Sequence, residues 1–358
     1  MSFFRSKSST TPPDEESILN CLRKVKYPGF SRNIVSFGLV KKVHCEENQI
    51  HVQLKISTTE PEIPVQIKKE IASVLQSTFP GFSPHIQIDL QQPAGPASPN
   101  EHATGITGIK HILAVASGKG GVGKSTVASN LAVSLQKMGH KVGLCDCDLY
   151  GPSVGVMFGT SERPYATSDN RIIPIERHKL KLMSMGFLLD DNAPAVLRGP
   201  MVTRYTQQFL RSVEWGNLDF LILDLPPGTG DIQLTIVQTV ALDGAIIVTT
   251  PQEVALIDAR KAASMFEKVN TPVLGLIENM SVFICPDTGK SYPIFGEGGG
   301  AKEAERLQVP LLGQIPIEMS TRQAGDEGTP ASITFPDSKS AQIFSQIATT
   351  LTHSLTAS

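Results

Sequence analysis

The chain has 358 residues, of which 40% are hydrophobic and 18% are charged, and this composition excludes a chain that is disordered throughout. Its 32 basic and 34 acidic side chains leave a net charge of −2, which excludes nucleic-acid binding through bulk positive charge. The length is that of roughly two or three folding units.

Residues 1–14 are mostly polar, and we predict a disordered tail there. Hydrophobic periodicity then predicts a small α+β domain over residues 15–90. Its predicted elements are helices over residues 16–25 and 63–78 and strands over residues 34–43, 49–56 and 85–90. Three prolines among small polar residues predict a flexible linker over residues 91–105.

Apolar runs alternate with helical patterns over residues 106–358, which form the second predicted domain. The predicted strands are residues 111–116, 141–146, 220–224, 244–250, 273–278 and 310–314. Continuous apolar strands between helices are typical of a parallel sheet that crossover helices bury on both faces. The predicted fold class is therefore α/β, preceded by the small α+β domain.

A phosphate-binding loop follows the first of these strands, where residues 117–126 read SGKGGVGKST and open a predicted helix. This strand–loop–helix context is the one in which the motif forms a P-loop. We expect Lys124 to reach the β- and γ-phosphates, Ser125 to ligate Mg²⁺ and Thr126 to hydrogen-bond the α-phosphate. The predicted nucleotide contacts of the loop are Gly118, Lys119, Gly120, Gly121, Val122, Gly123, Lys124, Ser125 and Thr126.

Three aspartates follow or end predicted strands, at the sheet edge where ligands of this architecture bind. Asp224 is the Walker B candidate, which would accept a hydrogen bond from Mg²⁺-bound water. We assign Asp146 to the Mg²⁺ shell and Asp148 to orienting the attacking water. The alternative is that these acids cap helices or line turns. Asn279 has an amide suited to reading the edge of adenine, or it forms a turn.

Lys119 is a second lysine that an ordinary P-loop does not require. The signature KGGxGK[ST] resembles that of the deviant Walker A ATPases, in which this lysine touches the phosphates bound by the other subunit. The resemblance implies a homodimer in which Lys119 stabilises transition-state charge, and the alternative is a solvated side chain. The predicted catalytic residues are Lys119, Lys124, Asp148 and Asp224.

Several segments together resemble the Mrp/ApbC-type iron–sulfur cluster carrier ATPases. They are SGKGGVGKST, DCDLYGPS, RGPM, LDLPPGTGD, PQEVAL, ENMSVFICP and IFGEGGG. Residues 15–90 resemble the small iron–sulfur-assembly domain related to SufT and PaaD. The resemblance implies an ATP-hydrolysing homodimer that carries a [4Fe–4S] cluster between its subunits. Its implied partners are apo iron–sulfur proteins and assembly factors.

Cys285 stands where the family carries the first cysteine of a Cys-x-x-Cys pair, and Thr288 replaces the second. Two subunits then offer two thiolates in place of the four that a cubane cluster prefers. Three interpretations of Cys285 remain. It is a remaining cluster ligand, it is one ligand of a site that an external thiol completes, or it is a structural cysteine. A threonine hydroxyl is a poor ligand for a soft metal.

The other cysteines and the histidines of the small domain suggest no further site. Cys145 and Cys147 are expected to point in different directions along their strand and to pack in the interior. The histidines of the small domain show no ligand spacing and are expected at the surface, namely His44, His51 and His85. We therefore predict client docking or regulation for this domain, without metal chemistry.

Five dispersed cysteines do not form a disulfide framework, so we expect a cytoplasmic protein. No membrane partner is expected, since no apolar stretch approaches the roughly 18 residues of a membrane span. No nucleic-acid partner is expected either, because the net charge is only −2. One alternative function is an ATP-gated assembly scaffold that has lost its own cluster. Another is a MinD/ParA-like positioning ATPase, which the absence of Lys and Arg from residues 340–358 disfavours.

Overall fold

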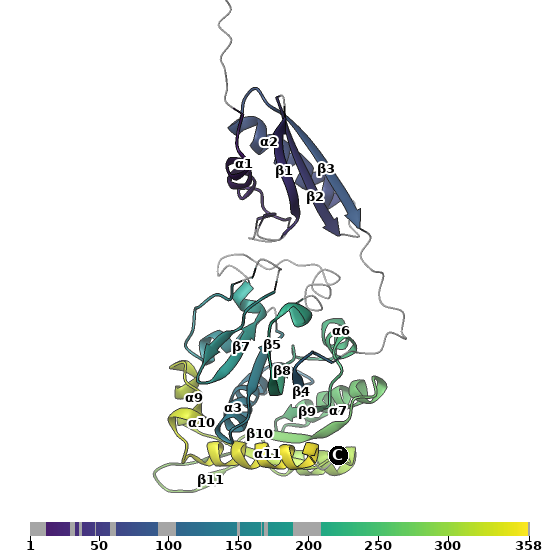
Figure 1. Ribbon diagram of the computed structural model, residues 1–358. Coiled ribbons are helices and arrows are strands. Elements are labelled where there is room, and N and C mark those ends of the chain that lie inside the picture. Colours follow the sequence, from purple (N-terminus) through teal and green to yellow (C-terminus); the bar gives the residue numbers. More distant parts are fainter. Residues whose placement is uncertain are drawn as a thin grey trace, which may run out of the picture. The chain divides into compact units, whose positions relative to one another are not determined.

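The computed structural model divides into two compact units, which are residues 12–91 and residues 105–356 of the described chain (Figure 1). The residues that the structure describes are 12–28, 33–35, 38–46, 48–57, 62–91, 105–148, 151–165, 167, 171–188 and 209–356. Most of the predicted tail and of the predicted linker lies outside them. Among the described residues, no helix is both long and apolar enough to cross a membrane.

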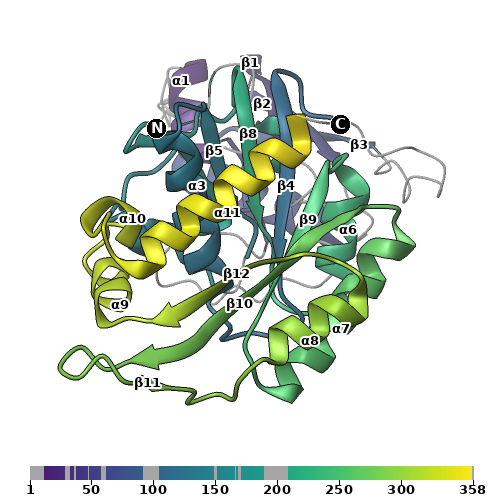
Figure 2. The same cartoon turned by 90° about the horizontal axis from the view of Figure 1, so that it is seen from below.

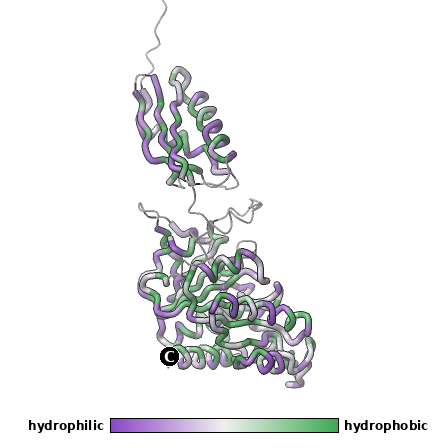
Figure 3. The backbone as a smooth tube through the Cα atoms, turned by 90° about the vertical axis from the view of Figure 1, so that its right-hand side faces the viewer, coloured by the Kyte–Doolittle hydropathy of each residue, from purple (hydrophilic) through white to green (hydrophobic). Residues whose placement is uncertain are grey.

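The small unit is a three-stranded sheet with two helices. Strands β1 (Val40–Glu46) and β2 (Gln49–Ser57) are antiparallel, and β3 (Ser83–Gln91) pairs parallel with β2. Its helices are α1 (Glu15–Leu22) and α2 (Glu62–Thr78), whose turns lie to one side of the strands in Figure 3. Alternate residues of β2 are buried, which are Ile50, Val52, Leu54 and Ile56. The intervening residues therefore face away from the core.

The predicted strand over residues 34–43 is wrong at its start, because the strand begins at Val40. Ile34 is buried in a turn, where its carbonyl accepts a hydrogen bond from the Leu39 amide at 3.2 Å. Gly38 has a φ of +66°, in the left-handed region that glycine adopts readily. Because of the turn at this glycine, the strand begins six residues later than predicted.

The large unit contains a nine-stranded sheet in the order β11-β10-β9-β4-β8-β5-β7-β6, with β12 also paired to β10 (Figures 1 and 2). Its pairs are parallel except β10–β11 and β6–β7. The strands are β4 (Ile109–Ala116), β5 (Val142–Asp146), β6 (Ile175–Arg177), β7 (Leu180–Ser184), β8 (Leu218–Asp224), β9 (Gly244–Thr249), β10 (Val273–Ile284), β11 (Ser291–Tyr292) and β12 (Leu311–Ile317). The six predicted strands are present, and β6, β7 and β11 are additional.

Helices cover both faces of this sheet, as its buried strands predict. Ile246 and Val248 of β9 pack in the cluster that includes α3 and α11, whereas Ile247 packs against Ala259 and Ala262 of α7. Since successive strand residues point to opposite faces, these helices lie on opposite sides. The helices are α3 (Lys124–Lys137), α4 (Val154–Met157), α6 (Asp231–Thr239), α7 (Glu253–Lys268), α8 (Gly299–Leu307), α9 (Met319–Asp326), α10 (Ala331–Thr334) and α11 (Lys339–Thr356), with the 3₁₀ turn Met185–Leu188.

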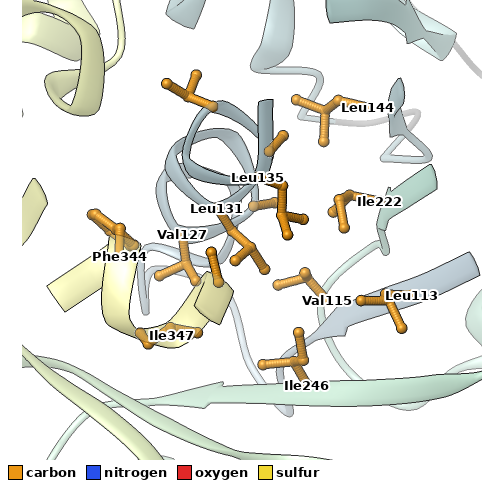
Figure 4. Packing of buried hydrophobic residues seen from close by; sticks show 14 of the residues in the cluster. Leu113, Val115, Val127, Leu131, Leu135, Leu144, Ile222, Ile246, Phe344 and Ile347 are labelled. Atoms are coloured by element: carbon orange, nitrogen blue, oxygen red, sulfur yellow. The ribbon is translucent and has the colours of Figure 1, made fainter. Parts of the chain in front are cut away.

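The main core fixes α3, the helix that follows the predicted phosphate loop. Val127, Leu131 and Leu135 recur at four-residue spacing and are fully buried against the sheet and α11 (Figure 4). Burying each such side chain contributes on the order of 1.5–3 kcal/mol. The amino end of α3 is therefore held firmly beside the carboxyl ends of the central strands.

Candidate functional site

The predicted phosphate loop runs between the end of β4 at Ala116 and the start of α3 at Lys124. Two of its glycines leave no room for a side chain. A Cβ on Gly118 would lie 2.0 Å from the carbonyl oxygen of Asp258, and one on Gly123 would lie 2.2 Å from Asn279 Nδ2. Gly123 also has a φ of +78°. The loop thus lies tightly against its neighbours at these two positions and leads into the amino end of α3, where backbone amides can bind an anion.

Lys124 and Asp224 form a buried ion pair at the base of the loop. Lys124 Nζ lies 2.5 Å from Asp224 Oδ1, and the two side chains are 6% and 0% exposed. Burial raises the pKa of Asp224 above its ordinary value, although the charge of Lys124 opposes this. The other carboxylate oxygen of Asp224, Oδ2, is buried without a hydrogen-bond partner in the described part of the chain.

Asp146 lies beside Asp224, because the two are register partners on β5 and β8. Its carboxylate accepts hydrogen bonds from the Asp148 amide at 3.0 Å, the Ser153 amide at 2.9 Å, the Val154 amide at 3.2 Å and the Ser184 hydroxyl at 3.2 Å. Burial and the nearby charge of Asp224 raise the pKa of Asp146 to about 6. Asp146 therefore orders the segment after β5, and its place in the Mg²⁺ shell stays a prediction.

Asp148 lies at the same edge of the sheet and is half-buried. Its carboxylate accepts a hydrogen bond from the Gly151 amide at 3.1 Å, and its charge contributes to the raised pKa of Asp224. The structure therefore brings the three predicted aspartates together. The role of Asp148 in orienting water stays a prediction.

The remaining loop residues differ in exposure. Gly120 and Gly121 are exposed, Val122 is buried, and Ser125 and Thr126 are half-buried. A Cβ on Gly120 or Gly121 would meet no heavy atom within 4 Å, so there is open space beside this part of the loop. This open side is where the predicted phosphate contacts would form.

Lys119 is half-buried at the start of the loop. Its carbonyl accepts a hydrogen bond from the Ser117 hydroxyl at 2.9 Å. Within the described residues, no ion pair holds its ammonium group. The charge of Lys119 is therefore available to a ligand.

Asn279 connects the loop to strand β10. Its Nδ2 donates a hydrogen bond to the Val122 carbonyl at 2.8 Å, and the side chain is buried. The structure thus shows a positioning role for Asn279, and its predicted contact with adenine stays a prediction. The next residue, Met280, has a φ of +55°, so the strand is irregular directly after this contact.

Cys285 follows the end of β10, six residues after Asn279, and its side chain is half-exposed. It opens the turn to β11, where its amide donates to the Lys290 carbonyl at 3.0 Å. A hydrogen bond from the Thr288 side chain, with others from the amides of Thr288 and Asp287, lowers the pKa of the Cys285 thiol. Thr288 therefore lies directly beside Cys285, and its hydrogen bond stabilises the thiolate of Cys285 relative to that of an ordinary cysteine.

The expectation that Cys145 and Cys147 point in different directions is wrong. Their sulfur atoms lie 3.9 Å apart, because residues two apart in an extended segment share one side. Both side chains are buried, as expected, and burial raises the pKa of the Cys145 thiol. They face the interior, so they do not substitute for ligands at Cys285.

Glu278 is a site residue that the sequence reasoning missed. It is 1% exposed and accepts hydrogen bonds from the Gly300 amide at 2.5 Å and from Gln314 Nε2 at 2.7 Å. A Cβ on Gly300 would lie 2.7 Å from the Cβ of Glu278. An acid inside the apolar run 273–279 was the available signal, because a buried carboxylate requires specific partners. Glu278 ties the IFGEGGG segment to the strand that carries Asn279.

Comparisons with known proteins agree with this geometry. A family model described as "NUBPL iron-transfer P-loop NTPase" matches residues 108–352, and one described as "Iron-sulfur cluster assembly protein" matches residues 15–88. A protein of Deinococcus radiodurans called "Iron-sulfur cluster carrier protein" is similar to this chain. It is 44% identical over 339 residues, which are 94% of each chain.

Solved structures are similar to the large unit. A nucleotide-binding protein of Archaeoglobus fulgidus, solved in complex with ADP, is 37% identical with a TM-score of 0.55, over 65% of this chain and 94% of that one. The cell division ATPase MinD of Pyrococcus furiosus is 24% identical with a TM-score of 0.53, over 68% of this chain and 98% of that one. The MinD likeness shows the fold alone. The predicted fold class and family resemblance are confirmed, and the chain belongs to the iron–sulfur cluster carrier family of P-loop NTPases.

Proposed function

We propose that this chain forms an ATP-hydrolysing homodimer of the cytoplasm that carries an iron–sulfur cluster and delivers it to apo-proteins. The observation that carries the proposal is a single strand, β10, which joins the two sites. Asn279 of β10 contacts the nucleotide loop at Val122, and the same strand leads to Cys285 within about 20 Å of chain. A change at the loop can therefore be transmitted to the thiol.

The nucleotide phosphates would bind to the amides of the loop, to Lys124 and to Thr126. The residues also fit Mg²⁺, because Asp224 has a buried oxygen without a described partner and Ser125 offers a hard hydroxyl oxygen nearby. Magnesium would neutralise charge on the β- and γ-phosphates. Asp224 would hold a metal-bound water and Asp148 would orient the water that attacks the γ-phosphate.

A second copy of the chain would complete the site. Lys119 is half-buried and lies at the start of the loop, and the described residues form no ion pair with it. In the proposed dimer it reaches the phosphates held by the other subunit, where its charge stabilises the transition state. Hydrolysis of ATP then weakens the contact between subunits, so that the cluster is released after hydrolysis.

The cluster is the cargo of this dimer, and Cys285 of each copy is its proposed ligand. The lowered pKa of Cys285 favours the thiolate that binds iron. Two thiolates are half of the complement that a [4Fe–4S] cluster prefers, so two external or client thiols complete the remaining iron sites. A site of this kind would hold its cluster loosely, which suits transfer.

Anaerobic reconstitution of the full chain with ferric iron, sulfide and an excess of a small thiol, which reduces part of the iron and completes the sites that Cys285 leaves open, tests the proposal. We expect charge-transfer absorption and about four irons per dimer. Cys285→Ser should lose both, whereas Cys45→Ser, which changes another partly exposed cysteine, should retain them. Iron retention by Cys285→Ser equal to that of the unmodified chain would refute the role of Cys285.

A second candidate function is an ATP-gated assembly scaffold without a cluster of its own. Thr288 favours it, because the hydroxyl beside Cys285 replaces the second thiolate of the family pair. In that case ATP-dependent binding of assembly proteins should be the same in Cys285→Ser as in the unmodified chain. Loss of that binding in Cys285→Ser would count against the scaffold.

A further inference from the structure

Three histidines of the small unit form a row across its sheet. His44 of β1 is the register partner of His51 of β2, and His51 is the register partner of His85 of β3. The three strands lie side by side in Figure 1. The row lies on the face opposite the buried residues of β2, because His51 alternates with Ile50 and Val52.

Metal-binding atoms of this row converge with a carboxylate. His44, His51 and Glu46 each offer one donor atom, and these atoms lie within 4.8 Å of one another. The rings of His44 and His51 are stacked, with centroids 4.7 Å apart and an interplanar angle of 8°. His44 Nδ1 is buried without a hydrogen-bond partner among the described residues. A buried nitrogen without a partner requires an explanation, and a ligand held by the residues of this cluster supplies one.

We propose that His44, His51 and Glu46 bind a divalent first-row transition-metal ion on the outer face of this sheet. Two imidazole nitrogens and one carboxylate oxygen are donors that such ions prefer, whereas Mg²⁺ and Ca²⁺ prefer oxygen alone. Metal–nitrogen bonds of ~2.0–2.1 Å place tetrahedral donors about 3.3 Å apart. Small side-chain rotations would bring the donor atoms to that distance, because the two histidines are partly exposed and Glu46 is exposed.

This inference departs from the expectation that the small domain has no metal chemistry. The histidines lie 7 and 34 residues apart along the chain, so their spacing resembles no ligand motif. Pairing of β1, β2 and β3 brings them together, and only the register reveals it. The site is independent of the proposed function, since it shares no residue with the nucleotide loop or Cys285.

Calorimetric titration of the full chain with Zn²⁺, in protein purified without a histidine tag, tests the site. Titration in a Cys285→Ser background removes thiolate binding from the signal. We expect one bound ion per chain, and at least a tenfold weaker affinity in His44→Ala, His51→Ala and Glu46→Gln. His353→Ala, which removes an exposed histidine of α11, should leave the affinity unchanged.

Titration with Co²⁺ provides the second measurement. Visible absorption without thiolate charge transfer is expected for nitrogen and oxygen ligands, and it should disappear in the His44→Ala, His51→Ala double variant. Because Glu46 is exposed, Glu46→Gln keeps the fold testable if a histidine variant unfolds. Zn²⁺ binding that is absent, or equal in the double variant and the unmodified chain, would overturn the site. Failure of cluster reconstitution at Cys285 would leave this result unaffected.

Discussion

Asp146 and Asp224 occupy the same register position on neighbouring parallel strands, and both carboxylates are fully buried. Lys124 forms an ion pair with Asp224 alone of the two. Two buried acids beside one ammonium leave the site short of positive charge. Burial raises the pKa of both acids, the charge of Asp224 raises that of Asp146 further, and the charge of Asp148 raises that of Asp224 further. Such a site favours a divalent cation.

Lys124→Ala should abolish nucleotide binding, because the variant loses the charge that is proposed to contact the β- and γ-phosphates. It should also lower the free energy of unfolding by about 3–5 kcal/mol, since Asp224 is left buried without its partner. Nucleotide titration and urea unfolding measure the two effects. The double variant Lys124→Ala, Asp224→Asn should recover stability without recovering binding. Nucleotide affinity that is unchanged in Lys124→Ala would contradict the assignment.

Lys119→Ala should leave nucleotide affinity nearly unchanged while lowering kcat on the order of 10³-fold, because the proposed role of the lysine is to stabilise charge that develops in the transition state. Steady-state hydrolysis and nucleotide titration separate the two quantities. Lys268→Ala, an exposed lysine in the last turn of α7, is the matched control and should keep full activity. Equal turnover in both variants would remove Lys119 from the mechanism.

The arrangement of the loop and the three aspartates could be predicted from the sequence because each part of it is a local pattern. The glycine loop, the apolar strands and their terminal aspartates lie within short segments, and the parallel sheet places their ends at one edge. Asp146 and Asp224 could therefore be expected near each other. The hydrogen bond from Asn279 to the loop could not be predicted, because its partner Val122 lies 157 residues away along the chain.

What the sequence did not predict depends on register. Ser184, which donates to Asp146, lies at the end of β7, a strand that the apolar pattern did not reveal. The row of histidines requires the pairing of three strands, and one-residue shifts would disperse it. The contact between Cys145 and Cys147, by contrast, follows from strand alternation, because residues two apart in an extended segment share one side.

Stability should depend on the protonation of Asp146. Its pKa is raised from 3.8 to about 6, so the folded chain binds its proton more tightly than the unfolded chain. This contribution is fully present below about pH 4 and is lost as the pH rises to about 6, with a total of at most ~3 kcal/mol. Asp146→Asn should remove that dependence. Urea unfolding without nucleotide or Mg²⁺ at several pH values measures it, and parallel curves for the two proteins would contradict it.

Thr288→Cys should strengthen cluster binding, because the side chain at this position already contacts the thiol of Cys285. A sulfur there would provide the second thiolate of each subunit, so a dimer would offer the four that a [4Fe–4S] cluster prefers. We expect at least tenfold slower loss of iron to a chelator under anaerobic conditions, since ligands near a metal change affinity by that order.

Thr350→Cys adds an exposed cysteine on α11 and controls for the extra thiol itself. It should release iron at the rate of the unmodified chain. If Thr288→Cys releases iron at that rate too, then Cys285 does not hold the cluster and the scaffold function gains support. If Thr288→Cys retains its cluster but transfers it to apo-proteins more slowly, then the loose site formed by Cys285 and Thr288 is what allows delivery.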